Sequence, residues 1–359
     1  MNILGLISLI LVAGFAIGCG RNALRFGIGP FKAFALTALQ LVFRIDLKEL
    51  AASKEAMQSK DTLMTVEASG LLEPWVLLAA LARDTRHVVR PEFQSHWLTL
   101  PFSRFGQVSA WDNKRPIANR SLASTSSDDG PLVLYLPSDV SPNNDVQKIL
   151  HGAAWLAWRQ KKKVVAVRFR GARFTYASTI RQDKSPRKLL GKVSASVGKS
   201  IALESRFAGK NPDRETRQDV FYDIISDARF WSANTDLSLF EALKSSAKRF
   251  SGKGRVAVED AVTGALSHRR MFIGARILAN RFSEFSKPGE AVALLLPNAN
   301  AVAVSFLALQ SAGRVPAMLN YTAGAANIIS ACKTAKAKNI ILSRAFVEKA
   351  DLQSVVDAL

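Results

Sequence analysis

The residue pair whose types and spacing come nearest to general-base chemistry is His87 and Glu92, with four residues between them. A histidine can remove a proton from a hydroxyl group when a carboxylate orients and polarises its imidazole. His87 opens a predicted strand that runs into Pro91, however, so the two side chains are not expected to meet. His96 lies among aromatic residues and His151 in a helical segment, and we expect ordinary structural or surface roles for both.

The sequence offers little evidence for a metal cluster, a disulfide framework or a nucleotide-binding loop. The two cysteines, Cys19 and Cys332, lie too far apart in the sequence to indicate a disulfide framework or a metal cluster. The segment 252–254 is too short for a phosphate-binding loop, and no lysine and hydroxyl pair follows Gly324 in the spacing of such a loop. The sequence therefore predicts no metal site and no cofactor held by this chain.

The elements that would position these residues alternate between strand and helix. In the first two thirds of the chain, strands are expected at 43–47, 63–66, 87–90, 131–137 and 163–170, and helices at 74–83, 149–159 and 217–229. After a candidate hinge at 232–236, further strands are expected at 256–260, 291–296 and 339–343, and helices at 269–285 and 302–312. The helix at 302–312 is apolar all round, which is typical of a helix packed on a parallel sheet. The alternation predicts an α/β fold.

The N-terminal segment predicts attachment to a membrane. Met1–Gly20 carries no charged residue and is just long enough to cross a thin bilayer as a helix. The basic residues that follow, beginning with Arg21 and Arg25, place the rest of the chain on the cytoplasmic side. A secretory signal peptide would carry a basic segment before the apolar one. The region 21–43 is expected to form an interfacial helix, since its stretch Phe31–Phe43 is apolar but interrupted by Lys32 and Gln40 and would lie against the lipid headgroups.

The charge of the chain indicates anionic partners. The formal net charge is +20 and the excess is spread along the sequence rather than gathered in a tail. Such a field favours phospholipid headgroups, acidic carrier proteins or nucleic acid. Zinc-finger spacing and an aromatic RNA-binding signature are both missing, so nucleic acid is not an expected partner.

Several motifs between Phe43 and about Phe230 occur in the order of a known family. They are Leu71-Leu72-Glu73-Pro74, Val88-Val89-Arg90-Pro91-Glu92, Leu100-Pro101-Phe102, Val133-Leu134-Tyr135-Leu136-Pro137 and the segment 165–175. This region resembles the glycerophospholipid acyltransferase domain, and most of all the one fused to a synthetase in bifunctional 2-acylglycerophosphoethanolamine acyltransferase / acyl-[acyl-carrier-protein] synthetases. The resemblance implies a bacterial inner-membrane protein with most of its chain in the cytoplasm. It also implies a lysophospholipid and an acyl carrier protein as partners.

At the family's catalytic and substrate-binding positions, this sequence carries different residues. The family's first motif is a histidine and an aspartate with four residues between them, and the matching positions here are Ala68 and Glu73. The third motif resembles Phe-Pro-Glu-Gly-Arg in the family and reads Leu136-Pro137-Ser138-Asp139-Val140 here. The resemblance puts substrate binding at Ser138, Asp139 and Arg168, and it leaves no intact catalytic residue. We therefore expect acyl transfer to be lost or much reduced.

Residues 238–359 resemble the N-terminal part of an adenylate-forming synthetase. The match is carried by Ala265-Leu266-Ser267-His268, by the strand that enters Pro297-Asn298, and by the segment 306–320. His268 is expected to pack or cap locally. The family's ATP loop, its Mg²⁺-binding Thr-Glu pair and its catalytic lysine do not occur before Leu359, so ATP and Mg²⁺ are expected only with a complete domain.

The resemblance implies four regions and leaves three functional hypotheses. The regions are a membrane helix at 1–20, an interfacial helix at 21–43, an acyltransferase-like domain at 44–231 and a synthetase fragment at 238–359. The first hypothesis is a degenerate or incomplete acyltransferase/synthetase. The second is an active membrane acyltransferase that uses Glu73 or a histidine such as His87 as its base. The third is a non-catalytic protein that binds lipid or acyl carrier protein.

Overall fold

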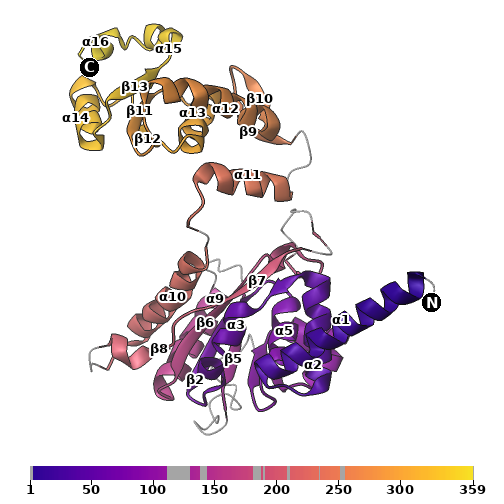
Figure 1. Ribbon diagram of the computed structural model, residues 1–359. Coiled ribbons are helices and arrows are strands. Elements are labelled where there is room, and N and C mark those ends of the chain that lie inside the picture. Colours follow the sequence, from indigo (N-terminus) through magenta and orange to yellow (C-terminus); the bar gives the residue numbers. More distant parts are fainter. Residues whose placement is uncertain are drawn as a thin grey trace. The chain divides into compact units, whose positions relative to one another are not determined.

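The computed structural model describes residues 3–110, 130–137, 144–180, 187–188, 191–207, 211–233, 235–250 and 255–358. The chain divides into two compact units, residues 1–233 and residues 234–359 (Figure 1). Each unit combines helices with a sheet whose strands are mostly parallel. The predicted α/β class is therefore confirmed.

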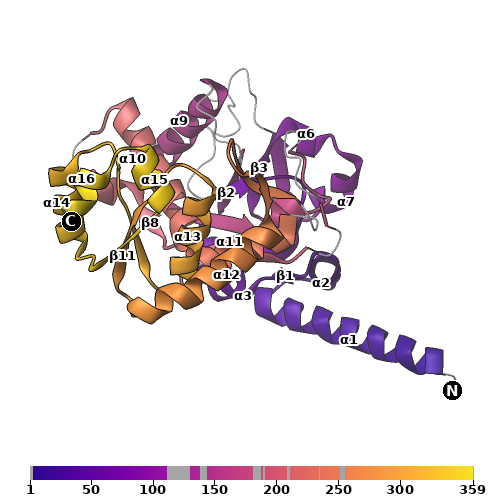
Figure 2. The ribbon, with the colours of Figure 1, turned by 90° about the horizontal axis from the view of Figure 1, so that it is seen from above.

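Two apolar helices open the first unit, α1 (Ile3–Phe26) and α2 (Pro30–Phe43). Within the described residues, α1 is the helix long and apolar enough to cross a membrane, over Ser8–Phe26. Figure 2 shows α1 projecting away from the sheet, and 11% of the apolar window is buried. Most of α1 therefore presents apolar side chains that the protein itself does not cover.

The break between the two helices falls later than predicted. α1 continues past Gly20 through Arg21 and Arg25, and the backbone leaves the helical conformation at Gly27, where φ is +62°. α2 then begins at Pro30, a residue that suits the first helical position. The first arginines thus mark the end of the uncharged span and lie inside the helix.

Buried polar contacts fix the last turns of α1 against α2. The side-chain amide of Asn22 donates to Thr37 Oγ1 at 2.9 Å and to Gln40 Oε1 at 2.6 Å. The rings of Phe15 and Phe34 pack edge to face, with centroids 5.0 Å apart. These contacts hold the C-terminal half of α1 on α2, and α2 in turn packs on the first unit.

The first unit is built on a mixed eight-stranded sheet. Seven strands follow the order β1-β7-β6-β2-β5-β3-β4, and β8 pairs with β6. Pairing is parallel throughout except where β6 meets β7 and β8. The strands are β1 (Ile45–Asp46), β2 (Thr62–Ala68), β3 (Arg86–Val89), β4 (Gln107–Ala110), β5 (Leu132–Pro137), β6 (Lys163–Arg170), β7 (Val193–Val197) and β8 (Ile201–Ala202).

Helices cover both faces of this sheet, which makes the unit a three-layer sandwich. One core joins α2 and α5 (Leu72–Ala80) to β2 residues such as Met64 and Val66, and the other joins α9 (Asn144–Arg159) and α10 (Arg214–Trp231) to Leu63. Successive residues of β2 therefore face opposite layers. The shorter helices are α3 (Lys48–Ala52), α4 (Lys54–Gln58), α6 (Pro91–Gln94), η1 (Trp97–Thr99), α7 (Leu100–Ser103), η2 (Ala172–Phe174) and η3 (Leu203–Arg206).

The second unit has a three-stranded parallel sheet in the order β12-β11-β13 and a separate hairpin of β9 and β10. Separate apolar cores cover the two faces of the sheet. Its elements are α11 (Leu239–Phe250), β9 (Val256–Asp260), β10 (Gly264–Ser267), α12 (His268–Phe285), β11 (Ala291–Leu295), α13 (Asn300–Ser311), β12 (Val315–Met318), α14 (Ala325–Ala335), β13 (Asn339–Leu342), α15 (Arg344–Lys349) and α16 (Gln353–Asp357).

Polar contacts tie the hairpin of the second unit to α13. Asp260 Oδ2 accepts a hydrogen bond at 2.6 Å from the backbone N–H of Asn300, the first residue of α13. The Asn300 amide donates to Thr263 Oγ1 at 2.8 Å and to the Gly264 carbonyl at 2.7 Å. The hairpin is thus held by capping and turn contacts that the apolar pattern alone does not reveal.

Candidate functional site

The turn that joins β2 to α5 holds the two positions expected to be catalytic in the acyltransferase family. β2 ends at Ala68 and α5 begins at Leu72, so Glu73 lies in the first turn of the helix. The backbone N–H of Ser69 donates to Glu73 Oε1 at 2.7 Å, and the Ser69 hydroxyl donates to the same oxygen at 2.5 Å. The carboxylate is thus directed back onto its own turn.

Glu73 is sealed from solvent. Only 1% of the surface of this residue is exposed. Burial raises the pKa of the Glu73 carboxyl, and the hydrogen bonds from Ser69 oppose that shift. Its second oxygen, Oε2, has no hydrogen-bond partner among the described residues. A carboxyl group in this environment favours its neutral form more than one in water does.

Ala68 supplies no group that could accept a proton. Its methyl side chain is 4% exposed and belongs to the core between the sheet and α5. The turn from Ala68 to Glu73 contains no histidine in the sequence. The structure therefore brings the two predicted positions into one turn, but the turn lacks the imidazole that a histidine–carboxylate pair needs.

A neighbouring backbone segment covers this turn closely. Gly70 forms an antiparallel bridge with Ser178, and the N–H of Leu71 donates to the Ala177 carbonyl at 2.9 Å. A Cβ atom at Gly70 would lie 2.0 Å from that same carbonyl oxygen. Only glycine allows this approach, so the sequence of the turn is fitted to a tight backbone contact.

Two more titratable groups are buried on the same face of the sheet as α5. His87 Nδ1 lies 2.9 Å from the hydroxyl oxygen of Tyr135, and both residues are almost fully buried. Burial, with the Lys32 ammonium adding to it, lowers the pKa of His87 to about 3. Burial also raises the pKa of Tyr135, and the Glu73 carboxylate adds to that rise. His87 is thus a neutral imidazole without access to solvent.

His87 and Glu92 do not meet, as the sequence predicted. Glu92 lies on α6 and pairs with Arg90, with Oε2 and Nε 3.3 Å apart. His96 accepts a hydrogen bond from the N–H of Leu98 at 3.3 Å, and its ring stacks on Trp97.

His268 makes a local contact in the second unit. Its Nδ1 lies 3.1 Å from the carbonyl oxygen of Arg255. Ser267 caps α12 by accepting from the N–H of Arg270 at 3.4 Å. His268 is therefore a packing residue at the start of α12 beside the true cap.

Of the three positions expected to bind substrate, Arg168 is the one that the structure describes. Arg168 lies on β6, where its Nη1 is 2.8 Å from Glu67 Oε2, and Arg229 of α10 binds the other oxygen of Glu67. Glu67 precedes Ala68 in β2 and so faces the opposite layer. Ser138 and Asp139 lie outside the described residues. Substrate binding by these three residues stays a prediction.

A pocket lies at the other end of α5. It has a volume of about 810 Å³ and is lined by residues of the α1–α2 connection, the N-terminal half of α2, the segment 81–83 and the region around α7. α5 has nine residues, so the two ends of the helix are about 13 Å apart at 1.5 Å per residue. The pocket is therefore a site separate from the turn.

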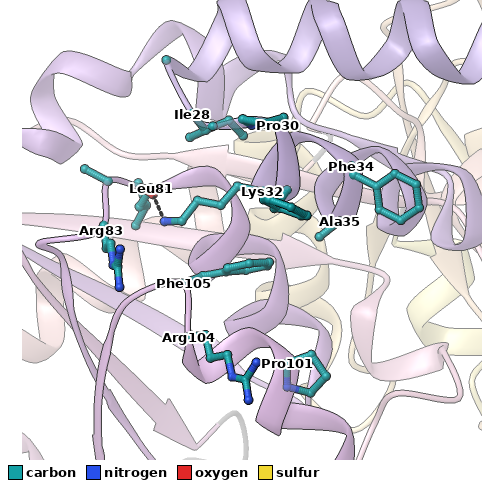
Figure 3. Close-up of a pocket in the computed structure, with 14 residues that line it drawn as sticks. Ile28, Pro30, Lys32, Phe34, Ala35, Leu81, Arg83, Pro101, Arg104 and Phe105 are labelled. Atoms are coloured by element: carbon teal, nitrogen blue, oxygen red, sulfur yellow. Dashed lines mark hydrogen bonds between the residues drawn. The ribbon is translucent and has the colours of Figure 1, made fainter.

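Three cations line this pocket: Lys32, Arg83 and Arg104 (Figure 3). Lys32 Nζ donates to the carbonyl oxygen of Leu81 at 2.7 Å and lies 5.9 Å from the centre of the Phe105 ring. Burial and the neighbouring Arg83 lower the pKa of Lys32 to about 8. In the sequence, Lys32 is recognisable as a charge within an apolar stretch. The pocket itself could not be predicted, because the residues that line it come from three separate segments.

Metal-binding geometry is missing from the part of the chain that the structure describes. No group of three His, Cys, Asp or Glu side chains lies close enough there to hold a metal ion. Cys19 and Cys332 are both free thiols.

No protein-family model matches the chain. Among solved structures, the 1-acyl-sn-glycerophosphate (LPA) acyltransferase PlsC from Thermotoga maritima is similar to this chain at 12% identity, over 64% of this chain and 98% of that protein, with a TM-score of 0.36. A benzoate CoA ligase from Burkholderia xenovorans LB400 is similar at 22% identity over 34% of this chain, with a TM-score of 0.30. VinN, solved in complex with 3-methylaspartate, is similar at 20% identity over 34% of this chain, also with a TM-score of 0.30. The chain covers 24% of the benzoate CoA ligase and 33% of VinN, and so spans a quarter to a third of their length.

Proposed function

We propose that this chain is a membrane-attached relative of the glycerophospholipid acyltransferase/acyl-carrier-protein synthetases that has lost acyl transfer or retains very little of it. The observation that carries the proposal is the turn after β2. Ala68 offers no proton acceptor there, and Glu73 is buried against Ser69. The order of motifs in the sequence supports the acyltransferase ancestry.

Acyl transfer to a hydroxyl group requires a base that reaches that hydroxyl. Loss of a positioned general base costs roughly 10²–10⁴-fold in rate. His87 is the nearest imidazole in sequence, but it is fully buried and hydrogen-bonded to Tyr135. A neutral, enclosed imidazole can accept a proton from a substrate only if the surrounding layer opens. The geometry therefore favours binding without turnover.

The partners we propose are a phospholipid membrane, a lysophospholipid such as lysophosphatidylethanolamine, and an acyl carrier protein. α1 supplies an exposed apolar surface, and the net charge of +20 suits phosphate-bearing and acidic partners. We place the protein at a bacterial inner membrane with the bulk of its chain in the cytoplasm. Nucleotide activation is not part of the proposal for these residues.

An acyl-transfer assay tests the proposal. Membranes that carry the full chain are incubated with radiolabelled acyl-acyl carrier protein and lysophosphatidylethanolamine, and labelled phospholipid is counted. We expect the unmodified chain to give no more product than membranes without it. The double variant Ala68→His, Glu73→Asp restores the histidine–aspartate pair of the family, and a gain of product in it would show that the acyl and glycerol pockets are intact.

The competing function is an acyltransferase that uses Glu73 or His87 as its base. Its support is the raised pKa of Glu73 and the unpartnered Oε2 and Nε2 atoms of the two residues, which are features of acid–base groups. Product formation by the unmodified chain that disappears in Glu73→Gln or in His87→Gln would establish this function and overturn the proposed one.

A further inference from the structure

We propose that the pocket between α2, the C-terminal end of α5 and α7 binds the phosphate group of an anionic phospholipid drawn from the membrane in which α1 lies. The inference rests on the proposed membrane attachment and goes beyond the proposed function, since the pocket is distinct from the turn at Glu73. Three observations carry it: the charge of the lining, the apolar rim, and the uncapped start of α2.

The charged residues that line the pocket are all basic, and the nearby Asp84 carboxylate, which acts on Lys32, lies outside the lining. Lys32, Arg83 and Arg104 all line the pocket, and none of the lining residues is Asp or Glu. Arg83 and Arg104 are exposed, and the guanidinium group of neither donates a hydrogen bond to another described residue. One guanidinium group can donate two parallel hydrogen bonds to the oxygens of a phosphate, and an ammonium group adds a point positive charge. The set is therefore complementary to a phosphate with net negative charge.

The start of α2 adds to this positive field. Gly29 is the N-cap of α2 and lines the pocket, and no side chain caps the first-turn N–H groups. A Cβ atom at Gly29 would have no neighbour within 4 Å, so the space in front of the helix is open. Free N–H groups at a helix N-terminus favour anions.

The rim of the pocket continues the apolar surface of the membrane helix. Phe31 is 83% exposed and Phe34 is 59% exposed, and both line the pocket. The ring of Phe34 also packs against Phe15 of α1. An acyl chain that leaves the pocket would therefore meet aromatic rings and then the exposed side chains of α1. This continuity favours a lipid over a water-soluble phosphate.

A purely structural role accounts for only part of the cluster. Lys32 donates to the Leu81 carbonyl, which lies at the C-cap of α5, and a cation there stabilises the end of a helix. That role gives no reason for Arg83 and Arg104 to line the same space. A pocket of about 810 Å³ also falls within the range that small-molecule ligands occupy.

Native mass spectrometry of the full chain in mild detergent tests the site. The probes are dioleoylphosphatidylglycerol, the zwitterionic dioleoylphosphatidylcholine, and inorganic phosphate. We expect saturable binding of one phosphatidylglycerol molecule, at least tenfold tighter than that of phosphatidylcholine and not displaced by millimolar phosphate. Displacement by phosphate, or equal affinity for the two lipids, would overturn the proposal.

Three variants separate the pocket from general surface charge. Arg83→Gln, Arg104→Gln leaves the Lys32 cap in place and should weaken phosphatidylglycerol binding about tenfold. The matched control Lys199→Gln, Arg206→Gln removes two exposed cations elsewhere in the first unit and should change binding less than twofold. Ala35→Trp fills the pocket without a change of charge and should also weaken binding. Equal effects of the two charge variants, or unchanged binding in Ala35→Trp, would contradict the site.

The outcome is independent of the acyl-transfer assay. The Glu73→Gln variant should bind phosphatidylglycerol as the unmodified chain does, because the turn and the pocket lie at opposite ends of α5. Acyl transfer by the unmodified chain would therefore overturn the proposed function without touching this site.

Discussion

Glu73, Tyr135 and His87 form a set of buried polar residues beneath α5, and burial shifts the pKa of each toward its uncharged form. Burial raises the pKa of Glu73 and Tyr135 and lowers the pKa of His87 to about 3. A histidine–carboxylate pair that deprotonates a hydroxyl group needs an imidazole beside the carboxylate and within reach of the substrate. Here the imidazole stands on another strand and bonds to Tyr135. At the residue scale, the groups are therefore arranged for packing.

The neutral state of His87 has a measurable effect on stability. An unfolded histidine takes up a proton near pH 6.5, whereas folded His87 does so only near pH 3. The contribution of neutral His87 to the free energy of unfolding is fully present above pH 6.5 and is lost as the pH falls toward 3. Between pH 7.5 and pH 5.0, the free energy of unfolding should fall by about 2 kcal/mol because of this residue. The variant His87→Gln cannot titrate and should lack that fall.

Urea unfolding of the full chain in mild detergent measures this difference. All six tryptophans lie in the first unit, so their fluorescence reports on it. Tyr135→Phe is the matched control, because it removes the hydrogen bond but keeps the titrating histidine, and it should retain the fall between the two pH values. The same pH dependence in the unmodified chain and in His87→Gln would contradict the burial of a neutral imidazole.

At the scale of elements, the close contact at Gly70 fixes the turn between β2 and α5. The substitution Gly70→Ala would place a Cβ atom 2.0 Å from the Ala177 carbonyl oxygen, and backbone must move to relieve it. We expect a loss of at least about 3 kcal/mol in the free energy of unfolding, measured by the same urea titration. Gly191→Ala is the control, since its nearest neighbours would lie at 3.7 Å and its change should stay within about 1 kcal/mol. Equal effects of the two substitutions would show that the turn is not held in this way.

Many of the elements could be predicted from local pattern. The strand at 163–170 and the strand at 256–260 have the predicted bounds, and the predicted helix at 149–159 is the C-terminal part of α9. These segments combine a regular apolar period with clear breaks at their ends. The strand expected at 43–47 is reduced to Ile45–Asp46, because α2 extends to Phe43 with Arg44 as its left-handed C-cap and Leu47 is the N-cap of α3. Its pairing partner, β7, lies about 150 residues further along the chain, and no local pattern specifies such a partner.

The sequence predicts the turn at Ala68 and Glu73, but it does not predict the cationic pocket. The turn at Ala68 and Glu73 could be predicted because its positions are neighbours in the chain and align with a motif of the family that the sequence resembles. The hydrogen bonds from Ser69 and the burial of the carboxyl are tertiary facts that the motif does not contain. The cationic pocket was missed because Lys32, Arg83 and Arg104 meet only after α2 packs on α5.

At the scale of the whole molecule, the exposed apolar surface of α1 supports the proposed attachment to a membrane. Side chains such as Leu11 and Ile17 are 68% and 71% exposed, so their transfer from water into lipid is favourable. The basic charge of the chain adds attraction to anionic headgroups, but that attraction is screened by salt. Salt does not screen the apolar contribution of α1, so this contribution should dominate attachment to the membrane at high ionic strength.

Membrane extraction distinguishes these two contributions. The full chain should remain in the membrane pellet after washes with 1 M salt, at which the Debye length falls to about 3 Å. The double variant Leu11→Glu, Ile17→Glu places charges in the apolar span and should be released by the same wash. Release of the unmodified chain by salt would show that charge alone holds it at the membrane.

The measurement that tests the central claim most directly is the initial rate of acyl transfer by the purified full chain in liposomes, with acyl-acyl carrier protein and lysophosphatidylethanolamine as substrates. The burial of Glu73 and the missing imidazole at Ala68 predict a rate no higher than that of liposomes alone, and the same rate for Glu73→Gln. A rate above this background that falls by roughly 10²-fold or more in Glu73→Gln would contradict the claim, because it would show that the buried carboxyl acts as the base.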